Sequence, residues 1–303
     1  LGSNPESSPA GATAEVPTLN IYSTDDTVVP GADIIGATNV MLSGADHYQV
    51  ATSEATFEAM YSFLNDGTPP ETLSISEQEQ GVSISGKVLT LGENNPLVGA
   101  TVAVFEVNPY TGERLNEIPN YTLNSDANGQ WGPIELGFCD MYELFVTSAN
   151  PNDRPIHYYR QGFLHDNSLV YLRTLPPAAS IAGLLLGGLP NNDNQSVLAI
   201  FTANQAVVNG RDNLYVDDLE LSSPTFASAD QTTIAFFLYD TGDNTTSGNS
   251  VGGLFDSTPF LNGVDVFMPT DTPNFIELQF NGKKMRVRNW KSASEGVIVA
   301  VFD

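Results

Sequence analysis

The chain has 303 residues and a formal net charge of −25, with 36 Asp and Glu against 11 Lys and Arg. This charge repels nucleic-acid phosphates and argues against nucleic-acid binding. Hydrophobic residues make up 41% of the chain, enough for the cores of two or three domains. No run approaches the roughly 18 consecutive apolar residues that cross a bilayer, so no transmembrane segment is expected. The chain starts with Leu1 and lacks the pattern of a signal peptide, which is expected of a processed or truncated product.

The first 67 residues have the pattern of an α/β fold. Apolar runs at 16–23 and 39–43 predict two strands. After them, Phe57, Tyr61 and Leu64 recur at helical spacing, with Ser53 placed as the N-cap and residues 65–67 closing the helix.

The rest of the chain is predicted to be all-β. From about residue 80, short β-rich runs alternate with Gly, Pro, Asn and Asp, which is typical of strands joined by turns. Pro69 and Pro70 stop the helix, and a second boundary is predicted near Pro176. The predicted division is an α/β part at 1–67, a linker at 68–79, a β domain at 80–175 and a second β domain at 176–303.

Residues with catalytic potential follow the two predicted strands. Asp25 and Asp26 come directly after the first strand, and His47 follows the second about twenty residues later. In a serine-hydrolase triad, a carboxylate fixes the tautomer of the histidine and stabilises the imidazolium that forms. The order acid then histidine, each after a strand, is the order found in α/β-hydrolases.

Three stretches here resemble the small Bacillus-type secreted lipases of the α/β-hydrolase superfamily: TLNIYSTDDTVV, GATNVMLSGADHYQV and the helix that follows. The resemblance implies Asp26 as the catalytic acid, with Asp25 as the alternative, and His47 as the catalytic base. It also implies secretion. Asp46 stands where the family has glycine, which leaves the shape of the histidine loop open.

The nucleophilic serine of such a triad is missing. A strained strand-to-helix turn of the form G-x-S-x-G or A-x-S-x-G normally carries it, and the chain has none. The nearest variant, around Ser180, lies in the β-rich half and after the histidine. Because two parallel strands and one helix are not a stable domain, we expect an upstream segment or a separate chain to supply the serine and the rest of the sheet.

Residues 82–115, with the turn Asp126 to Gly129 and the run MYELFVTS, resemble carboxypeptidase regulatory-like, transthyretin-like β-sandwich modules. The resemblance, together with the alternation at Val102, Val104 and Phe105, predicts an antiparallel sandwich here. Such modules are spacers or binding platforms. Asp126 and Asn128 are interpreted as turn residues and not as calcium ligands. The second β domain is predicted to be a sandwich or barrel.

Other polar residues are interpreted structurally. The basic stretch between Lys283 and Lys291 is predicted to form a charge-paired strand face opposite Glu277. His157 and His165 are interpreted as polar residues of the β module, since no further ligands stand at metal spacing. Cys139, in an apolar run, is predicted to be a buried core residue.

The sequence thus predicts the C-terminal part of a secreted lipase or esterase. It would hydrolyse carboxylic esters of lipids without a cofactor or metal, with Asp26 and His47 in this chain and the serine upstream. The alternative is a secreted β-rich binding or structural protein that carries an inert hydrolase remnant.

Overall fold

The computed structural model describes residues 16–75, 81–177, 180–227, 232–253, 255–258, 260–270 and 275–303, without the side chains at 181 and 185. The chain is mostly β-sheet with few helices, as the sequence predicts for its larger part. Residues 1–15 and the end of the predicted linker at 68–79 lie outside the described residues. None of the helices that the structure describes has the length and hydropathy to cross a bilayer.

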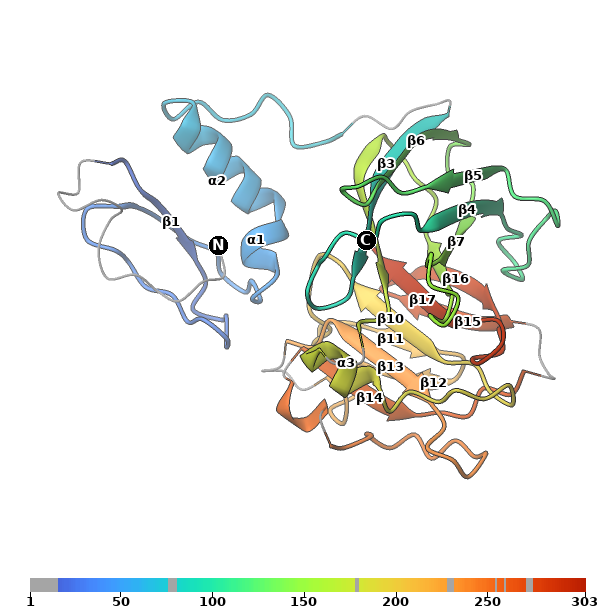
Figure 1. The fold of residues 1–303 in the computed structure, drawn as a ribbon. Helices are drawn as coiled ribbons and strands as arrows, with labels where there is room; N and C mark the ends of the chain where they lie inside the picture. Colours follow the sequence, from blue (N-terminus) through green and yellow to red (C-terminus); the bar gives the residue numbers. More distant parts are fainter. Residues whose placement is uncertain are drawn as a thin grey trace.

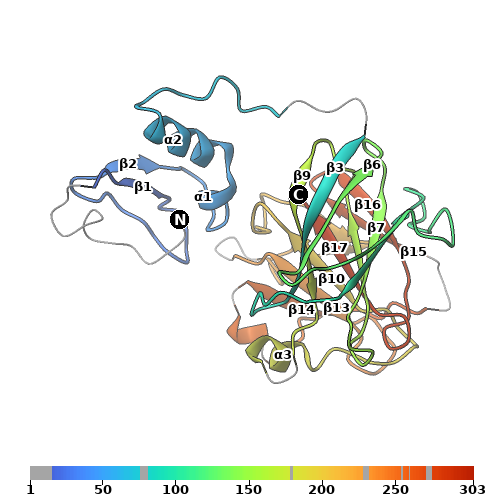
Figure 2. The ribbon, with the colours of Figure 1, turned by 45° about the horizontal axis from the view of Figure 1, so that its top comes forward.

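An α/β unit, residues 16–67, begins the described chain. Strands β1 (Leu19–Tyr22) and β2 (Thr38–Met41) pair in parallel, and helices α1 (Gln49–Thr52) and α2 (Glu54–Leu64) follow. The hydroxyl of Ser53 accepts a hydrogen bond from the Thr56 amide, which confirms the predicted N-cap. This unit lies beside the remaining structure, and α1 is on the side that faces it (Figures 1 and 2).

The α/β unit exposes much of its apolar surface. On α2, Phe57, Tyr61 and Leu64 are 52%, 38% and 75% exposed, although their spacing is that of a helix face made for burial. Met41 of β2 is 55% exposed. A two-stranded parallel sheet with helices on one face only leaves both outer sheet edges unpaired and the other face without cover.

The remainder, residues 81–303, is a single β-rich body, here called the β body. Its strands are β3 (Val82–Thr90), β4 (Thr101–Glu106), β5 (Tyr121–Asn124), β6 (Gln130–Leu136), β7 (Tyr142–Thr147), β8 (Ile156–Arg160), β9 (Asn167–Thr174), β10 (Leu198–Thr202), β11 (Leu214–Val216), β12 (Leu219–Glu220), β13 (Ala235–Tyr239), β14 (Leu261–Asp265), β15 (Phe275–Phe280), β16 (Lys283–Arg288) and β17 (Val297–Phe302). Its described residues also form the helix α3 (Ile181–Leu186) and a 3-10 turn, η1 (Phe255–Ser257).

The strands form three sheets. The central sheet has eight strands in the order β14-β13-β10-β17-β8-β7-β4-β5. It is flanked by a three-stranded sheet, β6-β3-β9, and a four-stranded sheet, β12-β11-β15-β16. The predicted boundary near Pro176 falls between β9 and α3, yet β8 and β17 from its two sides pair in parallel within the central sheet.

The central sheet is covered on both faces, which explains its unbroken apolar strands. In β10 and β13, Ala199 and Phe237 belong to one core, and their neighbours Leu198 and Phe236 belong to the other. Since successive side chains of a strand point to opposite faces, the fully buried run AFFLY needs a packing partner on each side.

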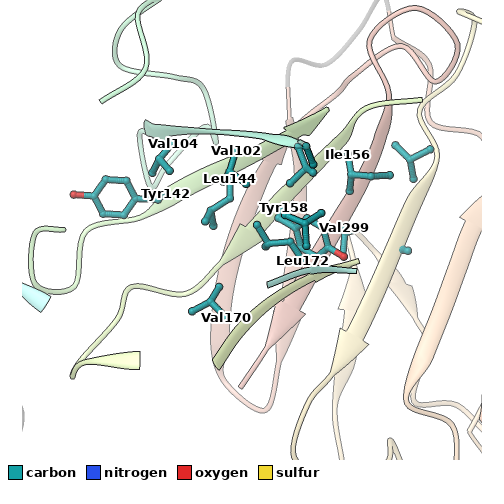
Figure 3. Packing of buried hydrophobic residues seen from close by; sticks show 14 of the residues in the cluster. Val102, Val104, Tyr142, Leu144, Ile156, Tyr158, Val170, Leu172 and Val299 are labelled. Atoms are coloured by element: carbon teal, nitrogen blue, oxygen red, sulfur yellow. The ribbon is translucent and has the colours of Figure 1, made fainter. Parts of the chain in front are cut away.

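The first core lies between the central sheet and the three-stranded sheet, where Leu144 and Tyr158 meet Val170 and Leu172 (Figure 3). The three-stranded sheet is tightly built at Gly86 of β3. A Cβ atom there would stand 1.8 Å from the Val170 carbonyl oxygen, so β3 and β9 approach this closely only with glycine.

The second core lies between the central and the four-stranded sheets.

Two structural predictions need correction. The first β region is not purely antiparallel, because β3 pairs in parallel with β9 while β4, β5, β7 and β8 pair antiparallel. Cys139 is exposed and not buried, since it occupies a turn between β6 and β7 with φ of 60°. The apolar run around it is therefore divided between two strands.

The basic stretch is paired as predicted. In β16, Met285 and Val287 are buried, while Arg286 stands opposite Glu277 of β15 and pairs with it. Lys284 reaches the same carboxylate at 3.3 Å.

The turn that begins at Asp126 also forms as predicted, since the Asp126 Oδ1 accepts hydrogen bonds from the amides of Asn128 and Gln130.

Candidate functional site

Asp26 is held rigidly just after β1. Its side chain is 2% exposed, and Oδ1 accepts hydrogen bonds from the amides of Val28 and Val29 at 2.8 and 2.9 Å. The second oxygen, Oδ2, lies 2.9 Å from Nδ1 of His47. The structure therefore brings together the two side chains that the sequence singled out.

Asp25 has a different contact. Its Oδ2 accepts the amide of Gly44 at 2.8 Å, and Gly44 has a φ of +72°, a conformation that glycine adopts without strain. Asp25 thus supports the loop that leads to His47 but does not touch the imidazole. Of the two acids considered from the sequence, Asp26 is the one that contacts the histidine.

The contact with Asp26 determines which ring nitrogen of His47 carries the proton. An ionised Asp26 is an acceptor only, so Nδ1 of the neutral imidazole carries the hydrogen and Nε2 keeps its lone pair. Nε2 has no hydrogen-bond partner among the described residues, and the side chain is 15% exposed. An imidazole in this state can accept a proton from a hydroxyl group placed at Nε2.

No serine of the described chain contacts His47. The hydroxyl of Ser180 caps α3 by accepting the amide of Gly183 at 2.9 Å, which is a structural role. Ser23, at the end of β1, is 1% exposed and accepts the amide of Asp25. The candidate acid and base lie together, and the described residues offer no nucleophile beside them.

The β body contributes residues to this site that sequence reasoning missed. The ring of Phe260 stacks on His47, with centroids 6.1 Å apart and planes at 23°. Arg211 forms an ion pair of 2.9 Å with Asp46, the residue before His47. The only local indication of these contacts in the sequence is Asp46 itself, which replaces the glycine found at this position in the lipases that this segment resembles.

An apolar cavity of about 640 Å³ lies in the β body and reaches the site through Tyr48. Its walls include apolar and aromatic side chains of the central sheet and of α3 and its surroundings, such as Tyr158, Leu186, Phe201, Phe237 and Val299. Burial, together with the charge of Asp46, raises the pKa of Tyr48 far above its usual value. The Tyr48 phenol therefore stays neutral beside the cavity.

The other histidine of interest belongs to a buried network. His157 of β8 is 1% exposed, its Nδ1 lies 2.6 Å from Glu143 Oε1, and its ring stacks on Trp290. Arg114 makes two hydrogen bonds to the same carboxylate. Although burial opposes ionisation, the hydrogen bonds from Arg114 and His157 hold the pKa of Glu143 below its usual value.

No metal centre is found in the described part of the chain, where no three His, Cys, Asp or Glu side chains are grouped to hold an ion. His165 lies in the connection from β8 to β9. Neither it nor His157 contacts the Asp26–His47 pair.

The comparisons with known proteins concern mainly the β body. A family model described as a lipase C-terminal domain matches residues 80–177, and a second model, of another C-terminal domain, matches residues 192–303. No curated protein matches the chain. Among solved structures, the Bacillus anthracis TIE protein aligns with 74% of this chain and 34% of its own, at 10% identity and a TM-score of 0.22.

This chain thus spans about a third of the length of that solved protein, and a likeness so weak carries no argument about function. The match at residues 80–177 covers the first part of the β body, from just before β3 to just after β9. It relates this part of the chain to the C-terminal domains of lipases.

Proposed function

We propose that the chain is the C-terminal part of a secreted ester hydrolase that acts on lipids through a Ser-His-Asp mechanism. Asp26 and His47 are its acid and base, and the serine lies in an upstream segment or a separate chain. The observation that carries the proposal is the 2.9 Å contact between Asp26 Oδ2 and His47 Nδ1 with Nε2 left unpartnered. The family match at residues 80–177 supports a relation to lipases independently of these two residues.

The chemistry follows from this geometry. The serine oxygen attacks the ester carbonyl carbon while His47 Nε2 takes the hydroxyl proton, and Asp26 stabilises the imidazolium. When the tetrahedral intermediate collapses, the C–O bond to the alcohol breaks and His47 returns the proton to the leaving oxygen. Water then takes the place of the alcohol and attacks the acyl carbon while His47 takes its proton. The bond between this carbon and the serine oxygen breaks, His47 returns the proton to that oxygen, and the carboxylic acid leaves.

The surface of the α/β unit supports an upstream partner. Phe57 and Leu64 on α2 and Met41 on β2 are more than half exposed, and both outer edges of the two-stranded parallel sheet are unpaired. Parallel sheets in proteins are normally covered on both faces. Further strands and helices of a hydrolase domain would pair with these edges and cover these side chains.

The cavity supports a substrate with an apolar chain. Its volume of about 640 Å³ falls within the usual size of ligand pockets, and its walls are mainly apolar. Tyr48 lines it and is adjacent in sequence to His47, so an acyl group that enters the cavity would leave its ester near the imidazole. Lipid esters therefore fit this arrangement better than short polar esters.

The test is labelling with a fluorophosphonate, which reacts covalently with an activated serine. The protein isolated from its natural source, with every chain that co-purifies, should be labelled on a serine within a G-x-S-x-G or A-x-S-x-G turn. His47→Ala should abolish labelling, whereas His165→Ala, a matched histidine away from the site, should leave it unchanged. Failure of the native protein to react, together with no turnover of nitrophenyl esters, would favour the alternative of an inert hydrolase remnant on a binding protein.

A further inference from the structure

The residue before the candidate base is anchored to the β body. Asp46 is 8% exposed, and its Oδ1 accepts the amides of Tyr48 and Gln49 at 2.9 and 3.0 Å, which fixes the turn that leads into α1. Its other oxygen, Oδ2, points away from the α/β unit. There it accepts the amide of Ala206 at 3.1 Å and Nη2 of Arg211 at 2.9 Å.

Arg211 is itself held in place from within the β body. Its Nε donates to Asp212 Oδ2 at 3.0 Å. The carboxylate of Asp212 is 5% exposed and also accepts hydrogen bonds from Gln205 Nε2 and Asn281 Nδ2, at 2.7 and 2.9 Å. Asn281 lies in the turn between β15 and β16, so the four-stranded sheet supports the orientation of the guanidinium.

Further contacts surround this ion pair. Arg211 Nη1 reaches Gln49 Oε1 at 3.1 Å, and the Thr52 hydroxyl donates to the Asn204 carbonyl at 2.6 Å. The Phe260 ring stacks on His47, while the Phe260 carbonyl accepts the amide of Ile234 just before β13. The turn that carries His47 is therefore held from the β body on more than one side.

We propose that Arg211 is a positioning residue for His47, acting through Asp46, and that the β body is thereby part of the catalytic unit. This inference rests on the proposed function and adds to it an interaction that sets the imidazole in place. It also gives a physical reason for aspartate in place of glycine at position 46. A glycine there could accept neither the amides of Tyr48 and Gln49 nor the guanidinium with a side chain.

The argument depends on how sensitive the Asp26–His47 contact is to movement of one loop. Asp26 is fixed by β1 and the turn after it, whereas His47 belongs to the turn that Arg211 holds. If that turn shifts by about 1 Å, the loss of alignment costs on the order of a hundredfold in rate. Substrate binding in the cavity would change less, because Arg211 is not among the residues that line it.

The test compares Arg211→Ala, Arg211→Lys and the control Arg286→Ala in the complete enzyme, that is, with the serine-bearing segment. The Arg286→Ala control removes an equivalent guanidinium, which pairs with Glu277 on a partly exposed face of the same β body. For each variant, kcat and KM are measured on a nitrophenyl ester, and hydrogen–deuterium exchange is measured for peptides covering residues 44–52. Exchange reports the docking of the loop whether or not the protein is active.

We expect Arg211→Ala to lower kcat about ten- to hundredfold, to change KM less than twofold, and to increase exchange across residues 44–52. Arg211→Lys should recover part of kcat, because one ammonium group can pair with Asp46 but cannot bridge it to Asp212. Arg286→Ala should resemble the unchanged protein in all three measurements.

Three results would overturn the proposal: unchanged exchange at residues 44–52 in Arg211→Ala, a change in KM alone, or an equal loss in the Arg286→Ala control. Failure of the proposed function has a different signature. If the enzyme turns over no ester and exchange nevertheless rises only in Arg211→Ala, then docking of the loop is upheld and its hydrolytic purpose is wrong.

Discussion

Asp25 and Asp26 are neighbours in the chain, yet they bind opposite ends of the same loop. Asp26 contacts the imidazole of His47 at 2.9 Å, and Asp25 accepts the amide of Gly44 at 2.8 Å. One carboxylate therefore orients the candidate base and the other orients the backbone that leads to it. The difference between the two acids can be measured directly.

In the complete enzyme, Asp26→Asn should lower kcat by about 10⁴-fold, because an amide at this position favours the wrong tautomer of His47. Asp25→Asn keeps an oxygen that can accept the Gly44 amide and should reduce kcat by less than tenfold. Steady-state kinetics on a nitrophenyl ester, with circular dichroism to verify folding, distinguishes the two. A larger loss in Asp25→Asn would mean that the triad acid has been misassigned.

The apolar face of α2 should matter for assembly and not for the stability of this chain. Leu64 is 75% exposed, so Leu64→Asp should change the free energy of unfolding of the isolated chain by no more than about 0.5 kcal/mol. If the proposed upstream segment covers this face, the same change would bury a charge against it and should prevent association or folding of the hydrolase part.

Leu115→Asp is the matched control, since Leu115 is 50% exposed on the β body. Urea unfolding of the isolated chain and size-exclusion chromatography of the assembled protein give the two measurements. Normal assembly of Leu64→Asp would show that this helix face is not the contact with the upstream segment.

Local features of the chain could be predicted from sequence, whereas contacts between distant segments could not. Ser53 and the spacing of Phe57 and Leu64 specify α2 through interactions a few residues apart. The order of Asp26 and His47 after successive strands also follows a local pattern. Their mutual contact was expected because parallel neighbouring strands end at the same sheet edge.

The central sheet and the Arg211 contact were beyond such reasoning. Arg211 is 165 residues from Asp46 in the chain, and no periodicity links them. The parallel pairing of β8 with β17 likewise joins two runs that read as separate domains, because a buried apolar strand does not specify its neighbour. Phe260 reaches His47 only because β13 and β14 carry it to that end of the sheet.

The buried Glu143 network should make stability depend on pH. Hydrogen bonds from Arg114 and His157 lower the pKa of Glu143 in the folded state, so its contribution to stability is present above the ordinary glutamate pKa of 4.5. That contribution is lost as the pH falls through the lower, folded-state pKa. The free energy of unfolding of the β body, measured with urea, should therefore fall progressively below about pH 4.5. The Glu143→Gln variant should show a flatter dependence of this free energy on pH.

Removal of Arg114 tests the same network at neutral pH. Arg114→Met leaves a fully buried carboxylate with fewer donors and should destabilise the β body by about 3–5 kcal/mol. Arg288→Met, at a second arginine that stacks on Trp290, is the control without an ion pair in the described structure. Equal urea midpoints for the two variants would mean that Arg114 acts by packing on its aromatic neighbours and not by pairing with Glu143.

The cavity should set the preference for acyl-chain length. Ala199 lies in its wall and is 2% exposed, so Ala199→Phe would place an aromatic ring in space that a long acyl chain needs. Because His47 and Asp26 are unchanged, hydrolysis of a two-carbon nitrophenyl ester should continue, while kcat/KM for a twelve-carbon ester should fall at least tenfold. Each extra methylene that loses its apolar contact costs about 0.8 kcal/mol, so the loss should grow with chain length.

The ratio of the two kcat/KM values controls for partial misfolding of Ala199→Phe, which would lower both values together. An unchanged ratio in a folded Ala199→Phe variant would place the acyl chain outside this cavity and leave the cavity without a part in substrate binding.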